Sequence, residues 1–210
     1  MASPWMDDTA LAARARRAAV AGGEAKAAVE AAVAARDVDR DVDRDAAAGR
    51  ELAQQFRHAM RRLTASVAIV ATREHGSRYG MTATALSALC TEPPSIVVCV
   101  NRNASLYLPL SRTRRFAVSL LNAGQHELVA PFSGKLEHAA RFGFGDWREA
   151  RGLPVLAGAQ ATLLCRVDAL HAYGSHDLVI GRVEAVTAAQ AVAPLLWQDG
   201  APAAARAIGA

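Results

Sequence analysis

Residues 78–105 read R-Y-G-M-T-A-T-A-L-S-A-L-C-T-E-P-P-S-I-V-V-C-V-N-R-N-A-S, and this stretch decides the fold. Its first half has the small and hydroxyl residues of an open strand, and its second half is an apolar strand with a polar end. Pro93 and Pro94 lack the amide hydrogen that a strand ladder needs, so we expect them to connect the two strands. Because Thr, Ala and Ser carry little bulk, the first strand predicts a bed where a large flat ligand can approach the backbone.

The same patterns extend over the rest of the chain. We expect strands over 66–72, 79–89, 95–101, 115–121, 159–171 and 177–188, helices over 52–63, 104–112 and 124–132, turns at 74–77 and 173–176, and a loop region over 142–158. Strands outnumber helices and are joined by turns or short helices. This order favours an antiparallel barrel over a doubly wound sheet.

Composition divides the chain into three parts. Residues 1–51 are rich in Ala and charge and predict a mobile or partly helical extension, 52–200 form the organised domain, and 201–210 form a flexible tail. Residues 1–55 carry 8 Lys and Arg against 10 Asp and Glu, whereas residues 56–210 carry 16 against 10. A modestly basic domain suits anionic ligands. Without a basic cluster that includes exposed aromatic residues, we expect no nucleic acid partner.

The three cysteines, Cys90, Cys99 and Cys165, form no C-x-x-C pair, so we expect free thiols and a cytoplasmic protein. No apolar run approaches the roughly 20 residues of a membrane span, so we expect no membrane partner. His, Cys and carboxylate residues lack metal-ligand spacing, and the two common glycine-rich phosphate loops are missing from the sequence.

Several sequence blocks, in order, carry a family resemblance. They are F-R-H-A-M-R-R-L, the stretch 78–105, R-F-A-V-S-L-L-N-A, Q-H-E-L-V-A-P-F-S-G, R-F-G-F-G-D-W, G-L-P-V-L-A-G-A and G-S-H-D-L-V-I-G-R-V. Together they resemble the flavin reductase family over residues 52–200. The resemblance implies a mainly β fold with short helices, an antiparallel Greek-key split barrel that binds FMN and forms a homodimer. It also implies hydride transfer from NADH or NADPH to FMN or FAD, and reduced flavin that diffuses to a partner monooxygenase.

The resemblance also implies the binding residues. They would be Met81, Thr82, Ala83, Thr84, Ser87, Asn101, Arg102, Asn103, Ser105, Phe132, Ser133, Gly134 and Lys135 for the flavin, with Trp197 and Gly200 toward the nicotinamide. Arg102 would pair with a flavin phosphate. His176, in a turn before the last long strand, would orient the nicotinamide or donate a proton, since imidazole titrates near neutral pH. The ring chemistry itself would belong to the cofactor.

One departure leaves alternatives open. The family commonly ends in an aromatic residue, two others, a glycine and a second aromatic, but Ala201 and Pro202 follow Gly200 here. A flavoprotein that keeps its flavin and reduces another acceptor, such as a corrinoid or a metal complex, is one alternative. A non-catalytic flavin- or haem-binding module is another, and an interaction protein that acts through the Ala-rich leader is a third. The sequence also leaves FMN against FAD, and NADH against NADPH, undecided.

Overall fold

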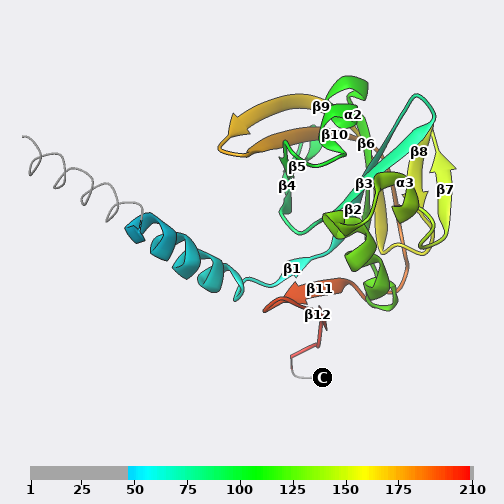
Figure 1. The fold of residues 1–210 in the computed structure, drawn as a ribbon. Coiled ribbons are helices and arrows are strands. Elements are labelled where there is room, and N and C mark those ends of the chain that lie inside the picture. The colour runs from blue at the N-terminus through cyan, green and yellow to red at the C-terminus, as the bar shows by residue number, and fades with distance from the viewer. Residues whose placement is uncertain (1–46, 209–210) are drawn as a thin grey trace, which may run out of the picture. The chain divides into compact units, whose positions relative to one another are not determined.

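The computed structural model of the chain describes residues 47–208 (Figure 1). Residues 47–60 form a helix, and Met60 begins the compact unit that carries the rest of the described chain. The helix therefore ends at residue 60 rather than 63. The expected extension over 1–51 lies mostly outside the described residues. No described helix is long and apolar enough to cross a membrane.

Twelve strands and four short helical elements follow. The strands are β1 (Ala65–Ser66), β2 (Ala68–Glu74), β3 (Ser77–Ala83), β4 (Leu86–Thr91), β5 (Pro94–Asn101), β6 (Arg115–Leu120), β7 (Trp147–Ala150), β8 (Leu153–Leu156), β9 (Ala161–Tyr173), β10 (His176–Ala188), β11 (Leu195–Gln198) and β12 (Ala201–Ala204). The helical elements are α2 (Tyr107–Thr113), the 3₁₀ helix η1 (Ala123–Leu128), the π-helical turn η2 (Pro131–Lys135) and α3 (His138–Arg141).

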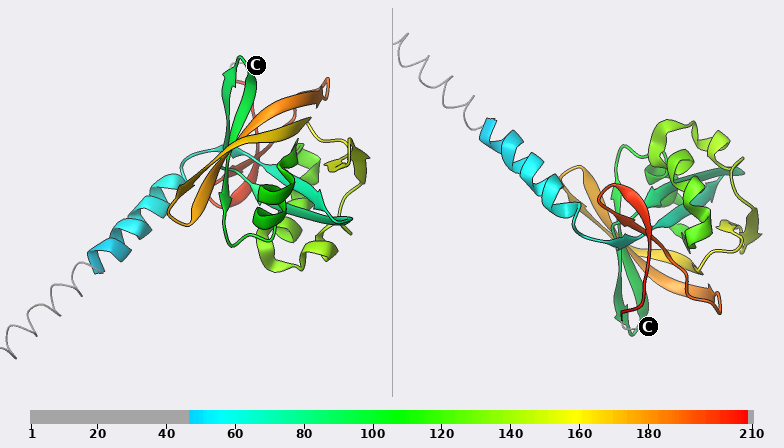
Figure 2. Two further views of the ribbon diagram at one scale, coloured as in Figure 1. Left: turned by 90° about the horizontal axis from the view of Figure 1, so that it is seen from above. Right: turned by 90° about the horizontal axis from the view of Figure 1, so that it is seen from below.

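Seven of these strands form one antiparallel sheet in the order β3-β2-β6-β9-β10-β5-β4. Its two edge strands, β3 and β4, follow each other in the chain and are separated only by Thr84 and Ala85. Two linking residues span at most roughly 11 Å, so the sheet has to curl until its edges come close. The result is an antiparallel barrel split between β3 and β4, and Figure 2 shows its curl from two further sides.

Three apolar clusters stabilise the described part of the chain, and β2 contributes to the two larger ones. Ala68 and Val70 belong to the cluster that also contains core residues of β5, β6, β9, β10 and α2, while Ile69 and Ala71 belong to a cluster with η1, η2 and β8. Successive side chains of a strand point to opposite faces, so both faces of β2 are buried. This double burial explains why the sequence of β2 reads as a continuous apolar run rather than as an alternating one.

The C-terminal segment differs from its expected form. The sequence predicted a flexible tail from residue 201, but Ala201–Ala204 form β12, which pairs with β11 in a small sheet with β1. Asp199 and Gly200 make the turn with φ values of 50° and 81°. Two positive φ angles are the geometry of a two-residue hairpin turn, for which Asp-Gly is a strong signal. Strand β12 forms although Ala201 and Pro202 replace the family's second aromatic residue, because its pairing with β11 uses the main chain.

Four further expectations needed correction. The loop region over 142–158 contains the β7–β8 hairpin. The helix expected over 124–132 is two separate turns, η1 and η2. The strand expected over 79–89 breaks at the link between β3 and β4, where the sheet changes edge. Pro94 also opens β5 rather than staying outside it, which is possible because the first residue of a strand need not donate a ladder hydrogen bond.

Candidate functional site

One buried guanidinium joins the segments that the sequence assigned to the flavin. Arg141, at the end of α3, is only 6% exposed. Its Nη1 donates to the Gly80 carbonyl of β3 at 2.8 Å and to Ser105 Oγ at 3.2 Å. Its Nε donates to the Leu136 carbonyl at 2.9 Å. Strand β3, the loop after β5 and the turn after η2 therefore meet at this side chain.

Sequence reasoning did not single out Arg141, although it opens the quoted block R-F-G-F-G-D-W. The signal that could have found it was a basic residue within an aromatic block, because such a block is expected to be buried. Charged side chains are rarely buried unless they are paired with another group. Among the described residues, Arg141 forms no ion pair with a carboxylate. The site therefore contains a buried cation whose charge is not matched by a bonded carboxylate.

Strand β3 supplies the wall of the site. Met81 is half-buried and Ala83 is 6% exposed, and both pack against the barrel core. The Thr82 hydroxyl donates to the Val129 carbonyl at 3.1 Å, which ties β3 to the segment before η2. Thr84 is exposed, at the link between the sheet edges. Of the two threonine hydroxyls, the one on Thr84 is thus the better placed to meet a ligand.

The loop after β5 lies beside that link. The Cys99 amide donates to the Ala85 carbonyl at 2.9 Å, so continuing the pairing places the end of β5 next to the end of β3. Asn101 Oδ1 accepts from the Asn103 amide at 2.9 Å, which shapes the loop as an Asx turn. Ser87, on β4, is exposed and donates to the neighbouring Ala88 carbonyl. The predicted residues of the first two segments are thereby brought together.

Arg102 differs from its expected role. Its guanidinium donates to the Gly174 carbonyl, and its Nε lies 3.2 Å from Oδ1 of the buried Asp177. The sequence assigned Arg102 to a flavin phosphate, but in the structure this side chain is committed to the β9–β10 turn. The physical reason is the pairing of β5 with β10, which brings Asp177 opposite Val100, two residues before Arg102. Arg141 is instead buried at the meeting point of these segments and forms no ion pair with a carboxylate among the described residues.

The predicted loop from Phe132 to Lys135 divides between core and surface. Phe132 is 1% exposed, and its ring packs 5.3 Å from the rings of Phe142 and Trp147. Its side chain therefore belongs to the core. Ser133 and Lys135 are exposed, and the Ser133 hydroxyl donates to a carbonyl one turn back. Gly134, between them, takes a φ of 95° that lets the chain turn out of η2.

A stacked pair of rings lies beside this loop. His138, on α3, stacks on Tyr79 of β3 with ring centroids 4.6 Å apart and planes 6° from parallel. Its Nδ1 lies 3.0 Å from Glu137. The pKa of Glu137 is lowered, first by a hydrogen bond from the Ala139 amide and further by His138 and Arg141. His138 was not among the predicted site residues, and the structure places it on Tyr79, next to Gly80 of the candidate site.

His176 is exposed at the first position of β10. Its Nδ1 lies 2.9 Å from Ser175 Oγ, and the residue stands opposite Asn101 in the pairing of β10 with β5. The predicted catalytic histidine is therefore next to the loop that carries the predicted flavin residues. Neighbouring residues across an antiparallel pair are about 4.5–5.5 Å apart at their Cα or Cβ atoms. The geometry is consistent with a ligand that touches both.

Trp197 and Gly200 lie in another sheet. Trp197, on β11, is half-buried against the apolar cluster that contains residues of β2, η1, η2 and β8. Gly200, in the turn to β12, has the Arg61 guanidinium beside it, and Arg61 also donates to the Asp199 side chain at 2.8 Å. The structure gives these two predicted nicotinamide residues no bonded contact with the cluster around Arg141.

Strands β3 and β4, the loop after β5 and Arg141 together offer groups that suit a flat ligand with an anionic end. The exposed hydroxyls of Thr84 and Ser87 and the amide of Asn101 offer hydrogen bonds along a small-residue wall. The buried guanidinium suits a phosphate, since charge-assisted hydrogen bonds to arginine are strong. Barrel and donor set together define a split-barrel protein that binds a phosphorylated ring cofactor.

The chain belongs to the flavin reductase like domain family, whose sequence profile matches residues 60–206. A curated relative, the FMN reductase (NADH) RutF of Methylorubrum populi, is 38% identical over 70% of this chain and 73% of its own. The solved NADH:FAD oxidoreductase SgcE6 of Streptomyces globisporus has a TM-score of 0.67 at 28% identity, over 71% of this chain and 90% of its own. The flavin reductase of styrene monooxygenase from Pseudomonas putida has a TM-score of 0.67 at 27% identity, over 73% and 98%.

Proposed function

We propose that this chain is an NAD(P)H-dependent flavin reductase that transfers hydride from NADH or NADPH to FMN or FAD. One observation carries the proposal: Arg141 gathers the three predicted flavin segments around a cation that has no bonded carboxylate among the described residues. The similarity to an FMN reductase (NADH) favours FMN and NADH as the pair used. When bound, the flavin supplies the hydride acceptor.

The residues of this chain bind and orient. Arg141 holds the phosphate end, taking the role that the sequence gave to Arg102. The Thr84 and Ser87 hydroxyls and the Asn101 amide hold the polar edge and the chain between ring and phosphate. Met81 and Ala83 form the apolar wall beneath. Arg141 and Asn101 are already held by hydrogen bonds within the fold, which limits the ordering cost of binding.

His176 acts on the nicotinamide side. Its ring stands at the start of β10, opposite Asn101, so it reaches the same region from the neighbouring strand. The Ser175 hydroxyl beside Nδ1 fixes the orientation of the ring and leaves Nε2 to face a ligand. We propose that Nε2 orients the carboxamide or holds a proton there. Trp197 and Gly200 are proposed as contacts at the far end of the nicotinamide nucleotide.

We also propose a homodimer, which the resemblance implies. The outer face of β5 and β10 supports it: Cys99 stands opposite Leu178 and Val97 opposite Ile180. The alternate residue Val98 is fully buried in the barrel core, so these four side chains point outward. Leu178 is 39% exposed. Sedimentation of the wild-type chain and of Leu178→Asp tests this: a dimer that the charge dissociates supports the proposal, and a wild-type monomer contradicts it.

The product, reduced flavin, is proposed to pass by diffusion to a partner monooxygenase. Similarity to the reductase of styrene monooxygenase supports this class of partner. The three cysteines are free thiols, which supports the proposed cytoplasmic location. Residues 1–51 are proposed to take no part in turnover, so a chain that starts at residue 52 should keep its activity.

The experiment that tests the function is steady-state oxidation of NADH and NADPH with FMN, FAD or riboflavin in excess. Turnover of added flavin supports the reductase. A protein that stays yellow and bleaches with NADH without turning over added flavin would instead be a reductase with a retained cofactor. Absence of oxidation with both nucleotides and all three flavins would contradict the proposal.

A further inference from the structure

A buried carboxylate next to His176 has no role in the reductase described so far. Asp177, the second residue of β10, is 4% exposed. Adjacent residues in a strand point to opposite faces, so Asp177 points into the barrel while His176 points outward. Burying an ionised carboxylate is costly unless other groups compensate it. The ionised Asp177 therefore depends on the groups that contact it.

Two side chains supply that compensation. The Tyr107 hydroxyl, at the start of α2, donates to Asp177 Oδ2 at 2.8 Å. Arg102 Nε lies 3.2 Å from Oδ1, close enough for an ion pair, although its angle does not make a hydrogen bond. The Asp177 hydrogen bond is also the main reason that the pKa of Tyr107 is raised. A phenol, a guanidinium and a carboxylate from three elements thus meet behind the His176 turn.

Arg102 extends this cluster to the turn itself. Its guanidinium donates to the Gly174 carbonyl, and its backbone amide donates to the Ser175 carbonyl at 3.0 Å. Both acceptors belong to the two residues between β9 and β10. The loop that begins at Asn101 is therefore tied to the turn that carries His176 by one side-chain and one backbone hydrogen bond.

We propose that Asp177, Arg102 and Tyr107 form a positioning cluster that holds the His176 turn in register with the flavin loop over 101–105. The inference rests on the proposed reductase function and assigns these residues to its nicotinamide side. They act through His176 rather than by touching the reacting rings. The cluster holds the tip of the β9–β10 hairpin, which carries His176, in a place where paired strands would otherwise fray.

The flavin side has separate supports. Ser105 accepts from Arg141, and Asn101 is fixed by its own Asx turn. Loss of the Asp177 charge should therefore loosen the His176 turn and leave the flavin contacts in place. This difference makes the cluster testable by a split between nicotinamide and flavin parameters.

The main variant is Asp177→Asn, which keeps the shape and removes the charge. We expect kcat/KM for NADH to fall about tenfold, the effect of one weakened charge-assisted contact. The dissociation constant of FMN, measured by flavin fluorescence without nicotinamide, should stay within about twofold. Tyr107→Phe removes only a hydroxyl and should give a smaller effect in the same direction. It also keeps the test valid if Asp177→Asn does not fold.

The matched control is Arg182→Gln. Arg182 pairs with Asp168 at 2.8 Å on the same β9–β10 hairpin, away from its turn. Hydrogen exchange of the Arg102 amide, followed by mass spectrometry, gives a readout that does not need turnover. We expect faster exchange in Asp177→Asn and wild-type exchange in the control.

The outcomes separate this inference from the reductase function. A wild-type chain that oxidises no NADH contradicts the function itself. An active wild type with unchanged NADH kinetics in both Asp177→Asn and Tyr107→Phe overturns the positioning cluster. Equal losses of FMN affinity and NADH kinetics also overturn it, since the cluster would then serve the whole site rather than the His176 turn.

Discussion

Replacing Arg141 by Met tests the flavin site at its centre. Met replaces the apolar stem of Arg141 with an unbranched side chain but has no guanidinium. The substitution therefore removes the hydrogen bonds to the carbonyls of Gly80 and Leu136 and to Ser105. Hydrogen bonds to charged groups contribute about 1.5–3 kcal/mol each, but they are not additive and the buried cation also costs free energy. We expect the free energy of unfolding to fall by about 2–4 kcal/mol, mostly because the buried Gly80 carbonyl loses its donor.

The second effect of Arg141→Met is on ligand choice. FMN carries a phosphate and riboflavin does not, so the guanidinium should favour FMN by about tenfold or more. Fluorescence titration of both flavins measures this ratio, and urea unfolding followed by tryptophan fluorescence measures stability. We expect the preference for FMN to collapse in Arg141→Met, while riboflavin affinity changes little in the folded fraction. Arg148→Met is the control, because Arg148 is exposed and pairs with Asp146 at 3.3 Å.

If Arg141→Met lowers stability but leaves the ratio of FMN to riboflavin affinity unchanged, the guanidinium only holds the three segments together. The phosphate would then bind elsewhere, and Lys135 would be the next cation to replace.

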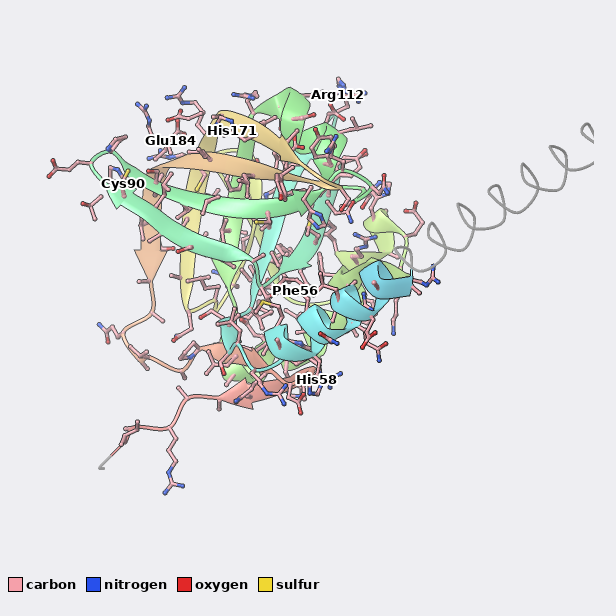
Figure 3. The ribbon with its side chains drawn as sticks, turned by 90° about the vertical axis from the view of Figure 1, so that its left-hand side faces the viewer. Phe56, His58, Cys90, Arg112, His171 and Glu184 are labelled. Carbon is pink, nitrogen blue, oxygen red and sulfur yellow. The ribbon has the colours of Figure 1, made fainter. Side chains whose placement is uncertain are left out.

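The remaining predictions concern the reaction, the core and the thiols. His176→Ala should lower the hydride-transfer rate or NADH affinity in stopped-flow traces while FMN still binds; equal kinetics would make His176 a turn residue only. Gly181→Ala should destabilise the barrel by about 1–3 kcal/mol in urea unfolding, because its Cβ would lie 2.4 Å from the Phe116 ring. Burial raises the pKa of the Cys165 thiol to about 12. At pH near 8, iodoacetamide should therefore modify the exposed Cys90, which Figure 3 shows on the β4–β5 hairpin, and spare Cys165 until the protein unfolds.

Much of the fold was predictable because its signals are local. The long strands, the turn at 173–176 and the small-residue wall of β3 follow from periodicity and turn residues within short windows. The signal for the C-terminal hairpin was equally local, since Asp199 and Gly200 are a standard turn pair. The Ala-rich composition of residues 201–210 wrongly predicted a flexible tail over Ala201–Ala204, because β12 is formed by main-chain pairing with β11.

The roles of individual side chains were harder to predict because they depend on distant partners. Arg102 looked free for a phosphate, and only the register of β5 against β10 brings it to Asp177. Phe132 looked like part of a binding loop, but the rings of Phe142 and Trp147 enclose it. Arg141 is important only through three partners from different segments. Long-range register and packing decide these assignments, and a short sequence motif does not contain them.

The central claim is that residues 78–105 and the segments gathered by Arg141 form a flavin site that works with NADH. The most direct measurement follows the nicotinamide absorbance of NADH mixed with catalytic amounts of the protein and excess FMN. We expect steady oxidation that requires FMN and stops when FMN is left out. Oxidation that is independent of added FMN, or no oxidation with either nicotinamide nucleotide, would contradict it.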